Sequence, residues 1–176
     1  MATLPILLFG NPILRRKARR IAQIDGSVQK LIDDMVDTLH DAQGIGLAAP
    51  QVGASLRVIV LDSPEQEPLV LINPALVKKR GERTVQEGCL SLPGYRGDIE
   101  RAVSVTVKGR DREGKEIRVK AEDILAQALE HEIDHLNGIL FTDHLDSMEK
   151  LYKVEPEKET EMGEVEEAPK AASMAT

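Results

Sequence analysis

The stretch Glu130-His131-Glu132-Ile133-Asp134-His135 decides how this 176-residue chain is interpreted. It lies in a helical pattern from about Glu122 to Asn137, with Gly138 where a helix would stop. The apolar face of that pattern comprises Ile124, Leu125, Ala128, Leu129 and Leu136. Residues four apart lie above one another on a helix, so His131 and His135 can hold one metal ion. Glu132 lies on the adjacent flank, where it suits a general base that does not bind the ion itself.

A third ligand is needed, because two histidines alone are typical of an ordinary surface helix. Downstream, Phe141 stands where an extended zinc-protease pattern would have a third His, and His144 comes three residues too late. Upstream lies Cys89, the only cysteine, next to Gly88. A lone Cys is usually a small buried hydrophobic residue. As a thiolate, however, it completes a Cys, His, His site with an open fourth position, which suits zinc or ferrous iron equally.

The composition is that of a globular domain with an aliphatic core. Hydrophobic residues make up 41% of the chain, Trp is absent, and there are only two Phe and two Tyr. One cysteine excludes an internal disulfide and fits a reducing compartment. The basic run Arg15–Arg20 follows an apolar segment, whereas a signal peptide has its basic residues before the apolar segment. In addition, no stretch has the roughly 20 apolar residues of a membrane span. We therefore expect a cytoplasmic protein with neither a membrane nor DNA as partner.

Charge is distributed unevenly along the chain. The segment after residue 154 has seven Glu and two Lys, a balance of −5 within the total of −7. It also has few large apolar groups, so we predict one catalytic domain over residues 1–152 and an acidic, disordered tail over residues 153–176. The basic run Arg15–Arg20 is typical of a solvated face, but it also offers a surface for RNA.

Four further patterns predict the remaining elements. Apolar spacing over Val28–Leu39 predicts a helix that Ser27 caps and that stops near Gly44. The glycine-rich segment 44–53 predicts a tight loop. Short aliphatic runs predict strands over 56–62 and 68–74. Alternating residues over 102–109 and 116–121, joined by a turn, predict a hairpin.

Three motifs stand in order along the chain: GIGLAAPQ (44–51), EGCLS (87–91) and QALEHEIDHLNG (127–138). Together they resemble the signature segments of the peptide deformylases, and the resemblance extends from about residue 4 to about residue 150. It implies an α+β fold in which small antiparallel sheets surround the metal-binding helix and the second helix packs outside. It also implies a metal-dependent hydrolase that removes the formyl group from N-formylmethionine at the start of new polypeptides and nascent chains.

By position, the resemblance makes Cys89, His131 and His135 the ligands of one divalent metal per chain. The native ion would be Fe²⁺, with Zn²⁺, Ni²⁺ or Co²⁺ as replacements. Glu132 becomes the acid and base of the reaction. The Gln51 side chain and the Leu90 backbone N–H become donors to the formyl oxygen.

The resemblance also assigns residues around this centre. Ile45 and Gly46 match the loop that pairs with the substrate backbone, and Arg96 faces either the peptide or solvent. Glu87 and Arg101 match a pair behind the metal loop, although an ordinary surface ion pair has the same sequence pattern.

Two alternatives stay open at this stage. A zincin-type endopeptidase would need a third ligand other than Cys89, and an inactive relative would use the metal only as a structural staple. The chain also departs from family members whose basic C-terminal helix is suited to ribosomal RNA, because only 147–154 has helical character and the tail is acidic. We expect any weak ribosome contact to involve Arg15–Arg20.

Overall fold

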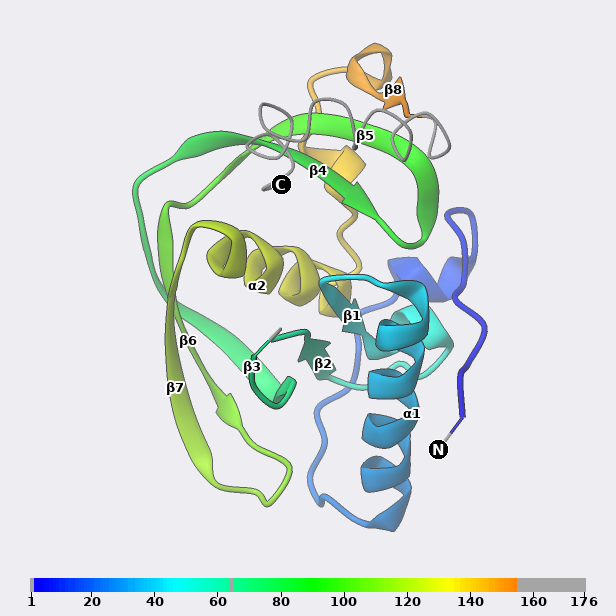
Figure 1. Cartoon of the computed structure of the whole chain (residues 1–176), viewed down its shortest axis with the longest axis vertical. Coiled ribbons are helices and arrows are strands. Elements are labelled where there is room, and N and C mark those ends of the chain that lie inside the picture. Colours follow the sequence, from blue (N-terminus) through cyan, green and yellow to red (C-terminus); the bar gives the residue numbers. More distant parts are fainter. Residues whose placement is uncertain (1, 64, 155–176) are drawn as a thin grey trace.

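The computed structural model describes residues 2–63 and 65–154 and has an α+β architecture (Figure 1). The predicted fold class is confirmed. The two α-helices are α1 (Gly26–Ala42) and α2 (Asp123–Leu136). The single-turn 3₁₀ helices are η1 (Pro12–Arg15), η2 (Ala49–Val52), η3 (Phe141–His144) and η4 (Met148–Lys150). The strands are β1 (Gly46–Ala48), β2 (Val58–Leu61), β3 (Leu69–Arg80), β4 (Arg83–Cys89), β5 (Leu92–Arg101), β6 (Ser104–Arg110), β7 (Glu116–Glu122) and β8 (Tyr152–Lys153).

Two antiparallel sheets form the framework of the described chain. The larger has the strand order β1-β2-β3-β6-β7, and the smaller has the order β4-β5-β8. Each pairing is antiparallel, and β6 and β7 form the predicted hairpin in unbroken register. Strand β3 runs to Arg80, six residues beyond the predicted strand, with two register irregularities against β6. The two sheets lie on opposite sides of α2 (Figure 1).

Helix α2 is the central element of the core. Figure 1 shows it between the β4–β5 hairpin and the larger sheet. Ala126, Leu129 and Leu136 on this helix are fully buried in one apolar cluster with residues of β2, β3 and β6. The helix ends as predicted before Gly138, whose φ of 75° is costly for residues with a side chain. Because its apolar side is fixed by this packing, its other side faces β4 with a defined orientation.

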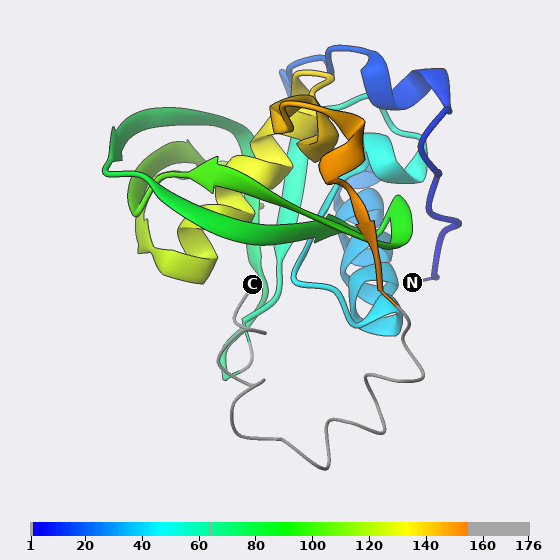
Figure 2. The same cartoon turned by 90° about the horizontal axis from the view of Figure 1, so that it is seen from above.

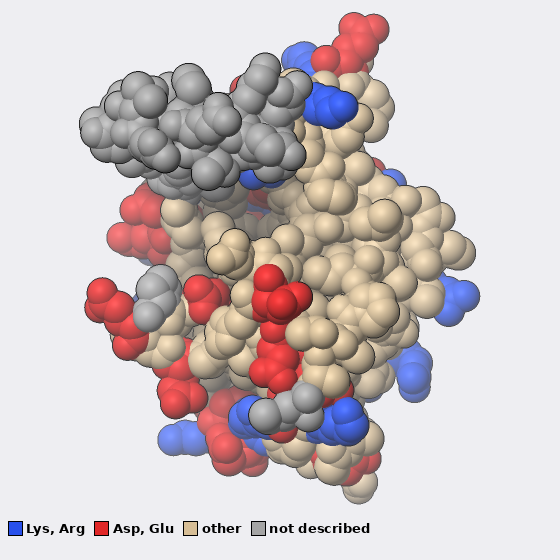
Figure 3. Space-filling model, turned by 45° about the vertical axis from the view of Figure 1, so that its right-hand side comes forward, with Lys and Arg blue, Asp and Glu red and all other residues tan. Residues whose placement is uncertain are grey.

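Helix α1 packs outside, against β1 and β2. Val28, Ile32, Met35 and Leu39 form its buried stripe, as the spacing predicts. The predicted cap is wrong by two residues: Asp25 accepts hydrogen bonds from the N–H groups of residues 27 and 28, and the Ser27 hydroxyl donates to Asp25. Figure 3 shows acidic side chains gathered along this side of the molecule.

Two segments that were expected to be loops contain strands. The segment 44–53, which was predicted to be a tight loop, contains the edge strand β1 and the turn η2. The segment around Cys89 forms a hairpin in which β4 pairs with β5 and only Leu90 and Ser91 lie between the strands. Neither strand has a clear alternating pattern at the Gly- and Pro-containing end, which explains why the local sequence did not predict them.

The segment 147–154, which was expected to be helical, has a different structure. It contains the short turn η4 followed by β8, which pairs with Tyr95 and Arg96 of β5 (Figure 2). The predicted domain boundary at residue 152 therefore falls inside a strand, and residues 155–176 of the predicted tail lie outside the described residues. Among the described residues, none of the helices has the length and apolar character that crossing a membrane requires.

Candidate active site

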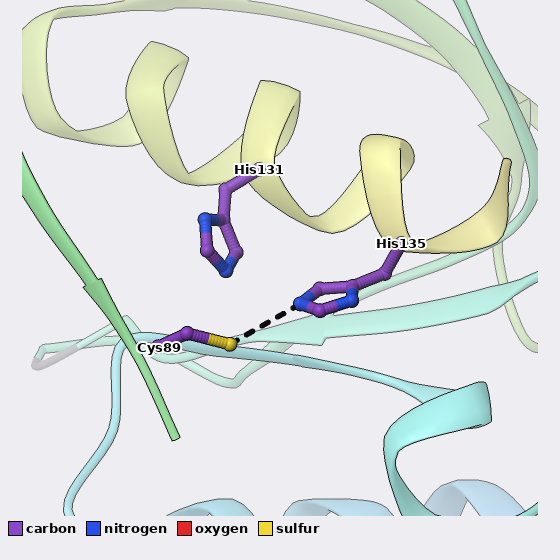
Figure 4. Close-up of side chains that lie close together, drawn as sticks. All are labelled: Cys89, His131 and His135. Carbon is purple, nitrogen blue, oxygen red and sulfur yellow. Dashed lines mark hydrogen bonds between the residues drawn. The ribbon is translucent and has the colours of Figure 1, made fainter. Parts of the chain in front are cut away.

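Helix α2 and strand β4 bring the three predicted metal ligands together. His131 and His135 project from the same side of α2 towards Cys89 at the end of β4 (Figure 4). The ligand atoms of the three residues lie within 4.8 Å of one another, and Sγ of Cys89 is 3.4 Å from Nε2 of His135. Residues 46 positions apart in sequence thus meet in one cluster.

A carboxylate behind His131 fixes the orientation of its ring. Nδ1 of His131 contacts Oε2 of Glu87, which is almost fully buried. An imidazole that donates from Nδ1 keeps its Nε2 lone pair free for a metal, which is the usual arrangement around protein-bound metals. Burial works against a charged His131, but the carboxylates of Glu87 and Glu132 outweigh it and raise the pKa of His131 well above 6.5. A metal ion would displace that proton.

The donor set fits a divalent transition metal. Burial and the charge of His131 lower the pKa of His135 well below 6.5, so its ring is neutral and available as a ligand. Nδ1 of His135 has no hydrogen-bond partner within the described chain. One thiolate and two imidazoles are characteristic ligands of zinc and iron sites, and three protein ligands leave a position for a substrate. Phe141, where a zinc protease would have its third His, instead stacks its buried ring on His131 at 6.3 Å between centroids.

Glu132 is buried beside the cluster. The residue is 4% exposed, and its Oε1 makes no hydrogen bond with any residue that the structure describes. Burial, opposed by the charge of His131, raises the pKa of Glu132 from 4.5 to about 7. A Cβ atom at Gly46 would lie 2.8 Å from Oε2 of Glu132, so the glycine allows β1 to approach this carboxylate closely. Such a group is suited to accept and return a proton near neutral pH.

Gln51 points a donor into the same space. Its Oε1 accepts the N–H of Ala48 at 3.0 Å, which turns Nε2 towards Sγ of Cys89 at 3.6 Å and the buried hydroxyl of Ser91 at 3.1 Å. Leu90, in the turn between β4 and β5, lines the same pocket. The amide of Gln51 is therefore held on two sides, and its orientation does not depend on a ligand.

An open cavity of about 390 Å³ lies in front of Cys89 and His131. Among the residues that line it are Ile45, Gly46 at the start of β1, Arg96 on β5, and Cys89, His131 and Glu132. The Ile45 side chain is 47% exposed, and the guanidinium of Arg96 packs over Gly88. Thus one cavity is lined both by two of the predicted metal ligands and by an edge strand.

The comparisons with known proteins agree with this arrangement. The sequence model of the polypeptide deformylase family matches residues 3–151. The chain belongs to the peptide deformylase family. It is 54% identical over 160 residues to a peptide deformylase of Dehalococcoides mccartyi strain CBDB1, covering 90% of this chain and 96% of the relative. It is 52% identical over 144 residues to that of Halothermothrix orenii, covering 81% and 94%.

Solved deformylase structures share the fold. A peptide deformylase from Legionella pneumophila superposes with a TM-score of 0.82 at 46% identity, covering 85% of this chain and 89% of that one. A Synechococcus elongatus peptide deformylase in complex with actinonin has a TM-score of 0.81 at 41% identity, covering 85% and 82%. This deformylase is thus a metal-dependent hydrolase that removes the N-formyl group from the start of new polypeptides. The alternatives of an endopeptidase and of an inactive relative are not favoured.

Each residue that the sequence predicts for this site lines the cavity or, as His135 and Arg101 do, contacts a residue that lines it. Sequence reasoning missed three residues that support it: Ser91, which accepts from Gln51, Gln127, which donates to Glu87, and Asp134, which pairs with Arg101. All three lie inside the quoted motifs, but nothing in their spacing indicates a partner that is distant in sequence.

Proposed function

We propose that Cys89, His131 and His135 hold the metal of this deformylase and that Glu132 moves the proton in formamide hydrolysis. The convergence of the three ligand atoms within 4.8 Å, next to a buried carboxylate, carries this proposal. A divalent ion bound there would supply a Lewis acid and an acidified water molecule at neutral pH. The chain's own residues would then position the formyl group and transfer protons.

Glu132 would accept the proton of the water that attacks the formyl carbon and later donate a proton to the leaving amine. Its raised pKa and its free Oε1 within the described chain support both roles. The attack places negative charge on the formyl oxygen. The Nε2 amide of Gln51 and the backbone N–H of Leu90 would stabilise that charge by hydrogen bonding. Prior fixation of Gln51 by Ala48 and Ser91 lowers the cost of this arrangement.

The substrate would bind as an additional strand on the edge formed by Ile45 and Gly46. Strand β1 pairs on its inner side with β2, so its other edge borders the cavity. Backbone pairing gives affinity with little dependence on sequence, which suits an enzyme that acts on many new chains. The methionine side chain would enter the apolar part of the cavity near Ile124 and Ala128, and Arg96 would face the peptide beyond it.

We assign Fe²⁺ as the native ion, with Zn²⁺, Ni²⁺ or Co²⁺ as replacements. Cysteine thiolate with two imidazoles accepts each of these metals, and the oxidation of a thiolate beside ferrous iron would favour zinc in protein prepared in air. Residues 1–152 form the proposed catalytic domain, and the predicted location is the cytoplasm, where a single free thiol stays reduced.

The test is formate release under exclusion of air. The purified chain, loaded with ferrous iron, is expected to release one formate per molecule of formyl-Met-Ala-Ser and to leave the internal peptide bonds intact. Formate is measured enzymatically and the peptide products by mass spectrometry, with metal-stripped protein as the control. Cleavage of an internal bond, or no formate from the fully loaded protein, would overturn the assignment.

We further propose that the basic run Arg15–Arg20 makes a weak ribosome contact. Arg15 pairs with Asp143, whereas Arg16, Lys17, Arg19 and Arg20 are exposed. Arg57 lies close enough to Arg20 for that charge, together with burial, to lower its pKa, but its guanidinium already donates to the backbone oxygens of Ala18 and Leu136. The side of the molecule seen in Figure 3 carries acidic side chains over α1 and would repel phosphates. The basic run therefore provides the surface that is suited to RNA.

Binding of a single-stranded RNA oligomer tests this contact. Four phosphate contacts give a slope of about −3 for the logarithm of the binding constant against that of salt concentration. Changing Arg16, Lys17, Arg19 and Arg20 to Gln is expected to abolish binding without changing formate release from a tripeptide. The matched control changes four exposed cations of the β6–β7 hairpin, namely Arg110, Lys115, Arg118 and Lys120. Equal loss of binding in both variants would show an effect of net charge and contradict a specific surface.

A further inference from the structure

A chain of polar contacts leads from the proposed metal ligand His131 to the surface. Glu87 contacts Nδ1 of His131 and accepts two hydrogen bonds from Arg101, from Nε at 3.0 Å and from Nη2 at 2.6 Å. Nη1 of Arg101 donates to Oδ2 of Asp134 at 2.9 Å. The same oxygen is 2.9 Å from Nε2 of His144. Exposure rises along the chain, from 2% for the Arg101 side chain through 19% for Asp134 to 35% for His144.

These contacts join α2 to the β4–β5 hairpin at two points. His131 and Asp134 lie three residues apart on one side of α2, whereas Glu87 lies near the end of β4 and Arg101 ends β5. The helix backbone and the four side chains therefore form a closed ring. Cys89 lies two residues beyond Glu87 on the same strand. A ring that fixes Glu87 relative to α2 consequently fixes the distance between the Cys89 thiolate and both imidazoles.

Asp134 supplies the contact that the Glu87–Arg101 pair lacks. The two-point contact with Glu87 uses one edge of the guanidinium and leaves the plane free to rock about that edge. The third nitrogen, held by Asp134, removes this freedom. His144 in turn holds the carboxylate of Asp134 from the other side. Removing a partner that contacts a metal ligand directly, as Glu87 does, changes metal affinity about 10- to 100-fold. Asp134 lies further out, behind Arg101, so we expect a smaller effect from it.

We propose that Asp134 and His144 are positioning residues of the metal centre, which act through Arg101 and Glu87 on His131 and Cys89. This inference rests on the ligand set proposed above. It predicts that breaking the Arg101–Asp134 or Asp134–His144 contact lowers the affinity for the metal, although neither Asp134 nor His144 contacts a ligand side chain. If the ion pair were purely structural, its loss would instead lower the stability of the fold and leave the affinity for the metal unchanged.

Release of cobalt distinguishes these two roles without using catalysis. Protein loaded with Co²⁺ is mixed with excess chelator, and the decay of the cobalt–thiolate absorption gives the rate of metal loss. Thermal unfolding of the same samples measures stability. The variants are Asp134→Ala, His144→Ala and His144→Gln, which keeps a donor for Asp134. The matched control, Asp143→Ala, breaks the Asp143–Arg15 ion pair next to His144 in the chain. Glu130 remains 4.0 Å from Arg101 as a counter-charge in the Asp134→Ala variant.

Asp134→Ala is expected to lose cobalt up to about 10-fold faster than the unchanged chain, the lower end of the effect of a direct ligand partner. His144→Ala should show a smaller acceleration, and His144→Gln should restore the original rate. If Asp134→Ala does not fold, the two His144 variants decide, since that side chain is partly exposed. The inference would be overturned if Asp134→Ala and His144→Ala lost cobalt as slowly as Asp143→Ala, whatever their unfolding temperatures. No cobalt–thiolate absorption in the unchanged chain would instead overturn the ligand set itself, and this inference with it.

Discussion

Replacing Glu132 by Gln is expected to leave the metal content unchanged and to lower kcat for formyl-Met-Ala-Ser by about 10²- to 10⁴-fold, the usual contribution of a positioned acid or base. Gln has the same shape as Glu and cannot exchange a proton with the substrate. Oε1 of Glu132 makes no hydrogen bond with the described residues, so the substitution breaks no contact of that atom. The effect should therefore be on turnover and not on folding.

A second buried glutamate on α2 provides the matched control. Glu130 is 7% exposed and accepts the N–H of Ala102 at 2.8 Å, on the side of the helix away from the cavity. Glu130→Gln removes the same charge from the same helix and should keep kcat within a few-fold of the unchanged chain. Metal content is measured by elemental analysis and turnover by formate release. Normal turnover in Glu132→Gln would refute its role, and equal loss in both variants would point to a general effect of charge.

The elements that carry their own periodicity were predictable from sequence. Helix α2 combines an apolar face with the His131–His135 spacing, and each feature depends only on residues within a few positions. The β6–β7 hairpin is likewise local, with alternating strands joined by a short turn. In both cases the structure results from burial of one face, and the apolar spacing that produces this face is visible in residues close together in the sequence.

Contacts between distant segments were predictable only where a motif indicated that a partner was needed. Cys89 was assigned as a ligand because the helix lacked a third one, although nothing near Cys89 predicts that β4 and β5 form a hairpin opposite α2. The partners Ser91 and Asp134 contact residues 40 and 33 positions away. Strand β8 forms where the sequence indicated a helix, because pairing with β5 outweighs the weak local preference of two residues.

Replacing Cys89 by Ala is expected to abolish tight metal binding. The thiolate is one of three side chains whose ligand atoms converge, and the two imidazoles that remain belong to one helix and approach the ion from one side only. After anaerobic loading and gel filtration, metal content should fall from about one ion per chain to near background, because ligands of this kind contribute several of the roughly 10–16 kcal/mol by which structural zinc sites bind. Formate release should fall with it.

Ser91→Ala is the control for Cys89→Ala. It lies two residues further along and removes a hydrogen-bond acceptor of Gln51 while the thiolate stays in place. This variant should keep its metal and lose only part of its turnover, because Nε2 of Gln51 becomes less well oriented. The zincin interpretation gives the opposite result for Cys89, since a site with a different third ligand would retain metal in Cys89→Ala. Metal retention at the level of Ser91→Ala would therefore exclude Cys89 as a ligand, whereas loss confined to Cys89→Ala requires a site completed from β4.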